Sequence, residues 1–322
     1  MRDALGVGAL NVDLIYEVDG LDIGGLRFEP GTEIMGDPAR FEAVLKDAQA
    51  KGRLLGKSGG GSAANAINAM ARMGMDTAFL GTVGKDEEGA FLLGEMAGTD
   101  IGHIRREGRS GQCVSLIAGR DRTMIVLPNA NDLLNVGQLE IMAANTFQAV
   151  HMSSFSADAA LRAQIRLAEA LEEEVLLSFD PGEKYAARGL DQLMLIMRRT
   201  DVLFVNEREV SMLTGMGADD GCRHLTELGP DVVVLKRGAK GSSVWADGEM
   251  MDIPQVQANV VDTTGAGDVY AGAFLTALLK GWGLKACGRF GAAAAARKVE
   301  QVGRSGYPDR KFLAEFSRRK GR

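Results

Sequence analysis

The chain has 322 residues and a mass of 34.2 kDa, with 46% hydrophobic and 25% charged residues. This composition is typical of a globular protein and excludes a disordered chain, a collagen-like chain and a small disulfide scaffold. With 37 Lys and Arg residues against 43 Asp and Glu residues, the net charge of −6 does not indicate binding to nucleic acid or to an anionic membrane.

In chain order, the first predicted elements are two strands and a helix. Residues 1–11 are largely apolar and predict a buried first strand, and the alternation over 14–18 predicts a second. Ser62 is expected to cap a helix that ends at Gly74. Residues 112–127 predict a hairpin of two strands with a polar, Gly-containing turn around Arg120.

From about residue 150 onward, short apolar strands alternate with amphipathic helices. This alternation is typical of a parallel sheet with helices on both faces, so we predict an α/β fold with a single domain over 1–322. The expected helices are 161–174, 190–199 and 207–213, the last stopped by Gly215, and the expected strands are 175–179, 202–205 and 232–235.

Two segments interrupt this rhythm and predict a small separate sheet. They lie at about 13–27 and 110–129. A small sheet that projects from an α/β body has one face to cover, so it either closes over a ligand cleft as a lid or pairs with a second subunit. An ordinary extra hairpin is an equally good interpretation of the sequence alone.

The cysteines and the apolar runs favour a cytoplasmic protein. Cys113, Cys222 and Cys287 are widely separated and match neither a disulfide framework nor a zinc motif, so we expect reduced, buried thiols. No apolar run reaches the roughly 18 residues of a membrane-spanning helix.

The segment 261–274 carries the strongest chemical pattern. Small residues lead directly into an apolar helix that we expect to begin near Val269 and to end at Gly281. The backbone N–H groups of Gly265, Ala266 and Gly267 would then lie at a helix N-terminus, where a phosphate binds well. Asp268 follows at once and could take a proton from a hydroxyl that attacks phosphorus, although a first-turn acid also has a purely structural use.

A second pattern covers residues 59–74. Three glycines allow the backbone to approach a ligand closely, and Asn65 follows in the first turn of the predicted helix. Its side-chain amide offers two donors and an acceptor to neighbouring hydroxyl groups. The alternative interpretation is a flexible turn followed by a solvated polar face.

Together these segments resemble the two signatures of the ribokinase-like (PfkB) carbohydrate kinases. The first is Gly60, Gly61 and Asn65 followed by 81–89, and the second is 262–268. The resemblance spans nearly the whole chain. It implies a ribokinase-like three-layer α/β sandwich with a mostly parallel central sheet and a β-sheet lid, often shared across a dimer. It also implies phosphorylation of a sugar or nucleoside hydroxyl by ATP with Mg²⁺.

The resemblance further implies roles for single residues at the acceptor and phosphate sites. Asp268 would be the general base, with an anion hole formed by Gly265, Ala266 and Gly267. Contacts to the sugar hydroxyls would come from Asp13, Gly60, Gly61 and Asn65.

Nucleotide and ion binding are implied for a further group of residues. Asn206 and Glu209 match an Asn-x-x-Glu motif that organises Mg²⁺ and phosphates, Glu209 acting through water. Lys236, Gly238 and Gly241 match a nucleotide-binding strand end. Asp262 and Thr264 match backbone positions of a monovalent-cation loop, so K⁺ is a further expected cofactor.

The acceptor is less well defined by the sequence. Ser62 stands where ribose-specific members have Lys, and the insertion over 36–57 resembles adenosine-kinase-like members. We therefore expect a sugar kinase, with a nucleoside kinase as the alternative and a non-catalytic binding protein of the same fold as the second alternative. A nicotinamide oxidoreductase is disfavoured because residues 6–11 lack the third glycine of a dinucleotide fingerprint. Phe28 or Phe41 could stack on a nucleoside base, but core positions are the favoured interpretation.

Overall fold

The computed structural model describes residues 1–119 and 121–320. Arg120, in the predicted hairpin turn, and the last two residues, Gly321 and Arg322, lie outside the described residues. Among the helices that are described, none is long and apolar enough to cross a lipid bilayer. The three cysteines are buried, as expected.

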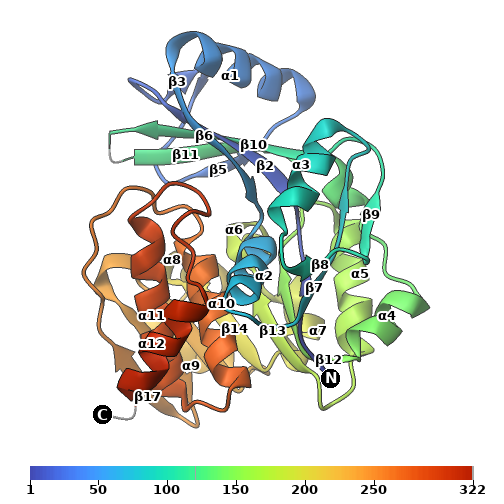
Figure 1. The fold of residues 1–322 in the computed structure, drawn as a ribbon, viewed down its shortest axis with the longest axis vertical. Helices are drawn as coiled ribbons and strands as arrows, with labels where there is room; N and C mark the ends of the chain where they lie inside the picture. Colours follow the sequence, from blue (N-terminus) through green and yellow to red (C-terminus); the bar gives the residue numbers. More distant parts are fainter. Residues whose placement is uncertain (120, 321–322) are drawn as a thin grey trace.

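The body of the molecule is a large twisted sheet (Figure 1). Seven neighbouring strands from β15 to β8 pair in parallel, and β16 and β17 add an antiparallel edge. In spatial order the strands are β17 (Glu249–Ile253), β16 (Ser242–Ala246), β15 (Val232–Lys236), β14 (Val202–Asn206), β13 (Leu176–Asp180), β12 (Phe147–Ser153), β1 (Arg2–Val7), β7 (Thr77–Val83) and β8 (Thr99–Asp100), with β9 (Ile104–Arg106) on β7. The prediction of a mostly parallel sheet is thus confirmed.

Helices cover both faces of this sheet and give a three-layer sandwich. One core cluster joins the sheet to α4 (Gln138–Ala144), α5 (Asp158–Glu169), α6 (Gly182–Ala186), α7 (Leu190–Arg199), α8 (Glu207–Thr214) and α9 (Ala218–Thr226). The other joins it to α2 (Ser62–Arg72), α3 (Glu87–Glu95), α10 (Ala266–Leu279), α11 (Leu284–Val299) and α12 (Arg310–Lys320). Apolar residues are buried on all sides of α10, because it packs between α2, α11 and the sheet.

Most predicted helix ends agree with the structure, and the differences have local causes. Helix α8 ends at Gly215, which adopts the left-handed conformation with φ of 68°. Helix α5 begins and ends earlier than predicted, at Asp158 and Glu169, and the chain turns over 170–174 before it enters β13. Ser62 is not the cap of α2: Gly61 occupies the N-cap position, and Ser62 is the first helical residue.

The two segments that interrupt the α/β rhythm contribute to a separate five-stranded sheet. Its strands, in spatial order, are β5 (Glu33–Met35), β11 (Asp121–Leu127), β10 (Gly111–Ala118), β2 (Asn11–Glu17) and β6 (Arg53–Gly60). We call it the small sheet. The rest of the 13–27 segment forms only a two-stranded ribbon of β3 (Asp22–Ile23) and β4 (Leu26–Arg27).

Helix α1 (Pro38–Lys51) covers the outer face of the small sheet (Figure 1). Phe28 and Phe41 are buried in the apolar cluster between α1 and this sheet, so both are core residues. The inner face is turned toward the body of the molecule. The insertion over 36–57 therefore supplies α1 and the first part of the edge strand β6.

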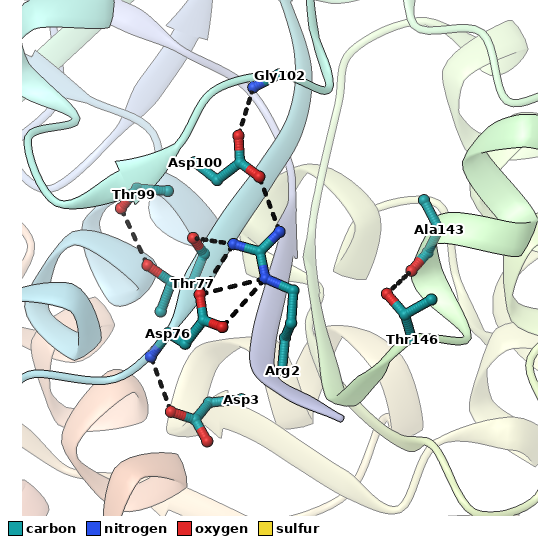
Figure 2. Close-up of polar contacts among 9 residues, drawn as sticks. All are labelled: Arg2, Asp3, Asp76, Thr77, Thr99, Asp100, Gly102, Ala143 and Thr146. Carbon is teal, nitrogen blue, oxygen red and sulfur yellow. Dashed lines mark hydrogen bonds and ion pairs between the residues drawn. The ribbon is translucent and has the colours of Figure 1, made fainter.

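Polar contacts of Arg2 fasten the start of β1 to its neighbours in the large sheet (Figure 2). Its guanidinium pairs with Asp76 at 2.9 Å and with Asp100 at 2.8 Å, on the segments that carry β7 and β8. Asp3 adds a bond by accepting from the Asp76 backbone N–H at 2.8 Å. These partly exposed contacts lie at the amino end of β1 and leave the opposite edge of the sheet free for the candidate site.

Candidate active site

Three consecutive parallel strands end in polar side chains at one edge of the large sheet. Strand β13 ends at Asp180, β14 at Asn206 and β15 at Lys236, and the register places Asn206 beside Lys236. Parallel strands present their carboxyl ends at the same edge, where ligands of open α/β sheets bind. The structure thus brings together residues that are separated by tens of positions in the chain.

The loop before α10 forms a helix N-terminus, as predicted. Gly265 is the N-cap and adopts a left-handed conformation with φ of 73°. Helix α10 begins at Ala266, three residues earlier than expected, so Asp268 lies within its first turn. The Ala266 N–H donates to the Thr263 carbonyl at 3.2 Å, which means that this amide is already bonded inside the loop and is not one of the free donors we expected.

The ammonium of Lys236 lies beside this loop. A Cβ placed on Gly267 would be 3.5 Å from Lys236 Nζ, an ordinary contact distance, so the ammonium lies directly beside the first turn of α10. Gly267 is therefore close to a positive charge as well as at a positive helix end. Both features suit an anion.

Lys236 is held by a buried carboxylate that the sequence analysis did not assign to the site. Its Nζ lies 2.6 Å from Asp180 Oδ2, and both side chains are largely buried. Burial by itself would lower the pKa of Lys236, but the carboxylates of Asp180 and Glu209 raise it above its ordinary value. Burial has the opposite effect on the carboxyl group of Glu209 and raises its pKa to about 7. The lysine is therefore a permanent cation at neutral pH.

Asn206 and Glu209 form a reciprocal capping box at the start of α8. Asn206 Oδ1 accepts from the Glu209 backbone N–H at 2.8 Å, and Glu209 Oε2 accepts from the Asn206 backbone N–H at 2.9 Å. Glu209 Oε1 also accepts from Asn206 Nδ2 at 2.8 Å. The motif thus stabilises the helix start in addition to any role toward a ligand.

Gly238 and Gly241 follow β15 in a short 3₁₀ turn. Both have positive φ, of 56° and 87°, which favours glycine at each position. A side chain at Gly241 would also overlap the Ile253 carbonyl oxygen of the neighbouring strand β17. These glycines let the chain turn sharply just beyond Lys236.

Asn65 and Asp268 meet directly, although 203 positions separate them. Asn65 Nδ2 donates to Asp268 Oδ2 at 2.9 Å. This bond connects the first turn of α2 to the first turn of α10. The two motifs that the sequence analysis singled out therefore form one site.

Arg304 and Tyr307 complete this cluster and were missed from the sequence. Arg304 is only 7% exposed, and it donates to Asn65 Oδ1 from Nε at 3.3 Å and from Nη2 at 3.2 Å. The hydroxyl of buried Tyr307 would lie 3.5 Å from a Cβ on Gly265. Arg304 thus fixes the orientation of the Asn65 amide so that its N–H points at Asp268.

The glycines at the junction of β6 and α2 accommodate their neighbours from the beginning of the chain. A side chain at Gly60 would overlap the carboxylate of Asp13, and one at Gly61 would overlap the carbonyl oxygen of Ala9. Gly61 also has a φ of 107°, which only glycine adopts without strain. Asp13 therefore lies against Gly60, and its contact with an acceptor stays a prediction.

Asp262 is buried in front of the α10 loop, and its carboxylate pairs with a lysine. Its Oδ2 lies 2.8 Å from Nζ of Lys298, and its Oδ1 accepts from the Thr264 N–H at 2.9 Å. Burial alone would raise the pKa of Asp262, but Lys298 and Thr264 lower it below its ordinary value. The Thr264 hydroxyl oxygen is buried and has no hydrogen-bond partner among the described residues.

A cavity of about 530 Å³ borders the cluster on the side of Arg304. It lies between β6, α2, α3 and residues 302–305. Its lining includes Lys57, Arg72 and Arg304 but neither Asp13 nor Asp268. The cavity is thus adjacent to the candidate site and separate from its two carboxylates.

Relatives of known sequence include kinases of two acceptor classes. The chain is 33% identical over 244 residues to an uncharacterised sugar kinase of Archaeoglobus fulgidus, covering 74% of this chain and 98% of the relative. It is 30% identical over 268 residues to a nucleoside kinase of Methanothermobacter thermautotrophicus, covering 80% of this chain and 85% of the relative.

Solved structures share the fold over nearly the full length. The adenosine kinase of Sinorhizobium meliloti matches with a TM-score of 0.86 at 21% identity, covering 100% of this chain and 99% of that chain. The Arabidopsis thaliana ribokinase complexed with ribose and ATP matches with a TM-score of 0.79 at 24% identity, covering 98% of each chain. These likenesses confirm the ribokinase-like α/β fold.

A family model described as pfkB family carbohydrate kinase matches residues 33–310. The matched residues include the two motifs that the sequence analysis singled out. They also include the capping box of α8 and the cluster around Asp268. Kinases of this family use ATP with Mg²⁺. The chain therefore belongs to the pfkB family of carbohydrate kinases and is a kinase of the sugar or nucleoside type.

Proposed function

We propose that the chain transfers the terminal phosphate of ATP to a hydroxyl group of a sugar or a related small alcohol, with Asp268 as the general base. The observation that carries this proposal is the 2.9 Å hydrogen bond from Asn65 to Asp268. It joins the segment expected to hold the acceptor to the carboxylate expected to take the proton. A base must lie within hydrogen-bond reach of the hydroxyl that it activates, and this bond supports such a placement.

The phosphate would be received by positive groups of the α10 loop. Lys236 carries its charge beside Gly267, and the dipole of α10 is positive at the same point. These groups would stabilise the charge that develops on the transferred phosphoryl group. Gly265 and Gly267 would supply backbone donors, whereas the Ala266 N–H would have to leave the Thr263 carbonyl first.

Magnesium would be recruited together with the nucleotide. Among the described residues, no three His, Cys, Asp or Glu side chains are placed to hold a metal by themselves. Glu209 would hold the ion through water, and Asn206 would orient Glu209. When bound, Mg²⁺ neutralises phosphate charge and thereby makes the phosphorus easier to attack.

The acceptor would bind between the small sheet and the α10 loop. Asp13 of β2 and the Gly60–Gly61 pair at the end of β6 would contact its hydroxyl groups. The small sheet would act as a lid that excludes water from ATP. Because α1 covers its outer face, the inner face is the one available to a ligand, and a homodimer formed through this sheet stays a prediction.

A nucleoside acceptor is the second candidate, and the Methanothermobacter relative is the observation that favours it. Neither phenylalanine considered for stacking on a base supports it, because Phe28 and Phe41 are buried in the apolar cluster between α1 and the small sheet. We therefore keep a sugar as the leading proposal.

Release of ADP from MgATP, measured with a panel of sugars, phosphorylated sugars and nucleosides, tests the proposal. We expect turnover with one class and a loss of about 10²-fold or more in kcat for Asp268→Asn. Asp231→Asn, at an exposed carboxylate before β15, is the matched control and keeps full activity. An Asp268→Asn variant that retains full kcat would refute the base assignment. A protein that binds MgATP but turns over no acceptor would favour the non-catalytic alternative.

A further inference from the structure

A buried lysine lies behind the phosphate loop and has no role in the proposed reaction. Lys298 is in the last turn of α11 and is 0% exposed. Its Nζ donates to Asp262 Oδ2 at 2.8 Å, to the Asp262 carbonyl at 2.9 Å and to the Gln301 carbonyl at 3.5 Å. Burying an ammonium is costly unless it is paired, and here both charge and hydrogen bonds are matched.

This ammonium joins three segments that meet behind the loop. Besides Lys298, the Asp262 carboxylate accepts from the backbone N–H groups of Thr264 and Gly303 at 2.9 and 3.0 Å. Thr264 immediately precedes the N-cap of α10, and Gly303 immediately precedes Arg304. One cation therefore helps to place both the anion-binding loop and the residue that orients Asn65.

The geometry conflicts with a monovalent metal ion at the Asp262 carbonyl. The resemblance assigned that carbonyl to K⁺, but the ammonium of Lys298 already donates to it. A K⁺ ion at contact distance from the same carbonyl oxygen would lie close to the ammonium, and two like charges repel each other strongly in a buried place. An ammonium carries the same single charge as K⁺ and likewise satisfies carbonyl oxygens.

We propose that Lys298 supplies, as a tethered ammonium, the positive charge that a monovalent metal ion would otherwise bring to this loop. Lys298 is thus a positioning residue, and phosphoryl transfer by this chain does not depend on K⁺. The inference rests on the proposed role of the α10 loop as the phosphate site. A tethered cation is present at every salt concentration, whereas a bound ion follows mass action.

The first test uses the unaltered protein and needs no variant. Its thermal midpoint and its kcat/KM are measured while KCl replaces tetramethylammonium chloride at constant ionic strength. We expect both to stay constant, with less than a twofold change in kcat/KM. A K⁺-dependent rise in either quantity overturns the inference. The midpoint requires no substrate, so a chain that proves inactive as a kinase still decides this question.

The second test removes the ammonium and leaves space for an ion. Lys298→Ala is expected to lower kcat/KM by about tenfold or more in tetramethylammonium, and K⁺ is expected to restore both activity and thermal midpoint. Lys298→Met fills the same space without charge and is expected to lose activity that K⁺ does not restore. Lys285→Ala, at an exposed lysine of the same helix, is the matched control and shows neither effect.

A purely structural ion pair predicts a different pattern. In that case Lys298→Ala is destabilised equally in both salts, and that result overturns the inference. If Lys298→Ala does not fold in either salt, the titration of the unaltered protein decides alone.

Discussion

A buried histidine beside the candidate site makes stability depend on pH. His151 lies in β12, is 1% exposed and shares a 3.0 Å hydrogen bond with the Ser178 hydroxyl. Burial lowers its pKa from 6.5 to about 4, with Lys236 acting in the same direction and Asp180 opposing it. The imidazole is therefore neutral in the folded protein throughout the physiological range.

The sign and size of the effect follow from proton linkage. Between pH 6.5 and about 4 the unfolded chain binds a proton at this residue and the folded chain does not, so stability falls as the pH is lowered through this window. The whole pKa difference corresponds to about 3 kcal/mol of the free energy of unfolding. About 2 kcal/mol of it is lost by pH 5, and the contribution is complete above pH 7.

The assay compares urea unfolding of the unaltered protein and His151→Gln at pH 7.5, 6.0 and 5.0. Glutamine keeps a polar group for Ser178 but does not titrate in this range. Between pH 7.5 and 5.0, we expect the free energy of unfolding of His151→Gln to fall by about 2 kcal/mol less than that of the unaltered protein. His103→Gln, at a partly exposed histidine, is the control and retains the slope of the unaltered protein. If the free energies of unfolding of the unaltered protein and of His151→Gln change equally with pH, the reasoning is refuted.

Two further predictions concern the acceptor side of the site. Gly61→Ala combines strained backbone with overlap of the Ala9 carbonyl oxygen, so we expect a loss of at least about 2 kcal/mol in urea unfolding. Gly25→Ala, which has a φ of 73° but no neighbour within 4 Å, is the control and costs about 1 kcal/mol. Arg304→Met removes the donors to Asn65 Oδ1, and we expect about a tenfold higher KM for the acceptor with the KM for ATP within twofold. An unchanged acceptor KM in a folded Arg304→Met protein would mean that the arginine does not orient Asn65.

The predictable part of the site consists of local patterns. The small residues before α10, the Asn-x-x-Glu box of α8 and the Gly60–Gly61 pair each depend on neighbours within a few positions. Backbone chemistry of this kind is visible in sequence, because helix caps and positive φ angles have strong residue preferences. The start of α10 was placed too late, because the glycines at its beginning have low helix propensity. The N-cap of α2 was likewise placed one residue too late, at Ser62 instead of Gly61.

The unpredictable part consists of partners that are brought together by the fold. Arg304 reaches Asn65 across 239 positions, and no periodicity signals such a pair. Lys298 follows a run of alanines in the last turn of a helix, where a lysine usually interacts with the helix dipole at the surface. Its ammonium is instead buried against Asp262 and the Gln301 carbonyl. Asp180 offered one local signal, since it ends an apolar strand immediately before Pro181.

The connections of the small sheet have a mechanical consequence. Strand β1 of the large sheet passes into β2 through three residues, and β6 passes into α2 through Gly61 alone. Strand β2 carries Asp13, and strand β6 carries Gly60. The sheet is also joined to the body before β10, through residues 107–110, and after β11, through residue 128. With four short connections the small sheet would tilt as one unit, and Asp13 and Gly60 would move together. In the proposed function, an acceptor that draws the small sheet toward the body would set its own hydroxyl contacts and close the site in a single movement.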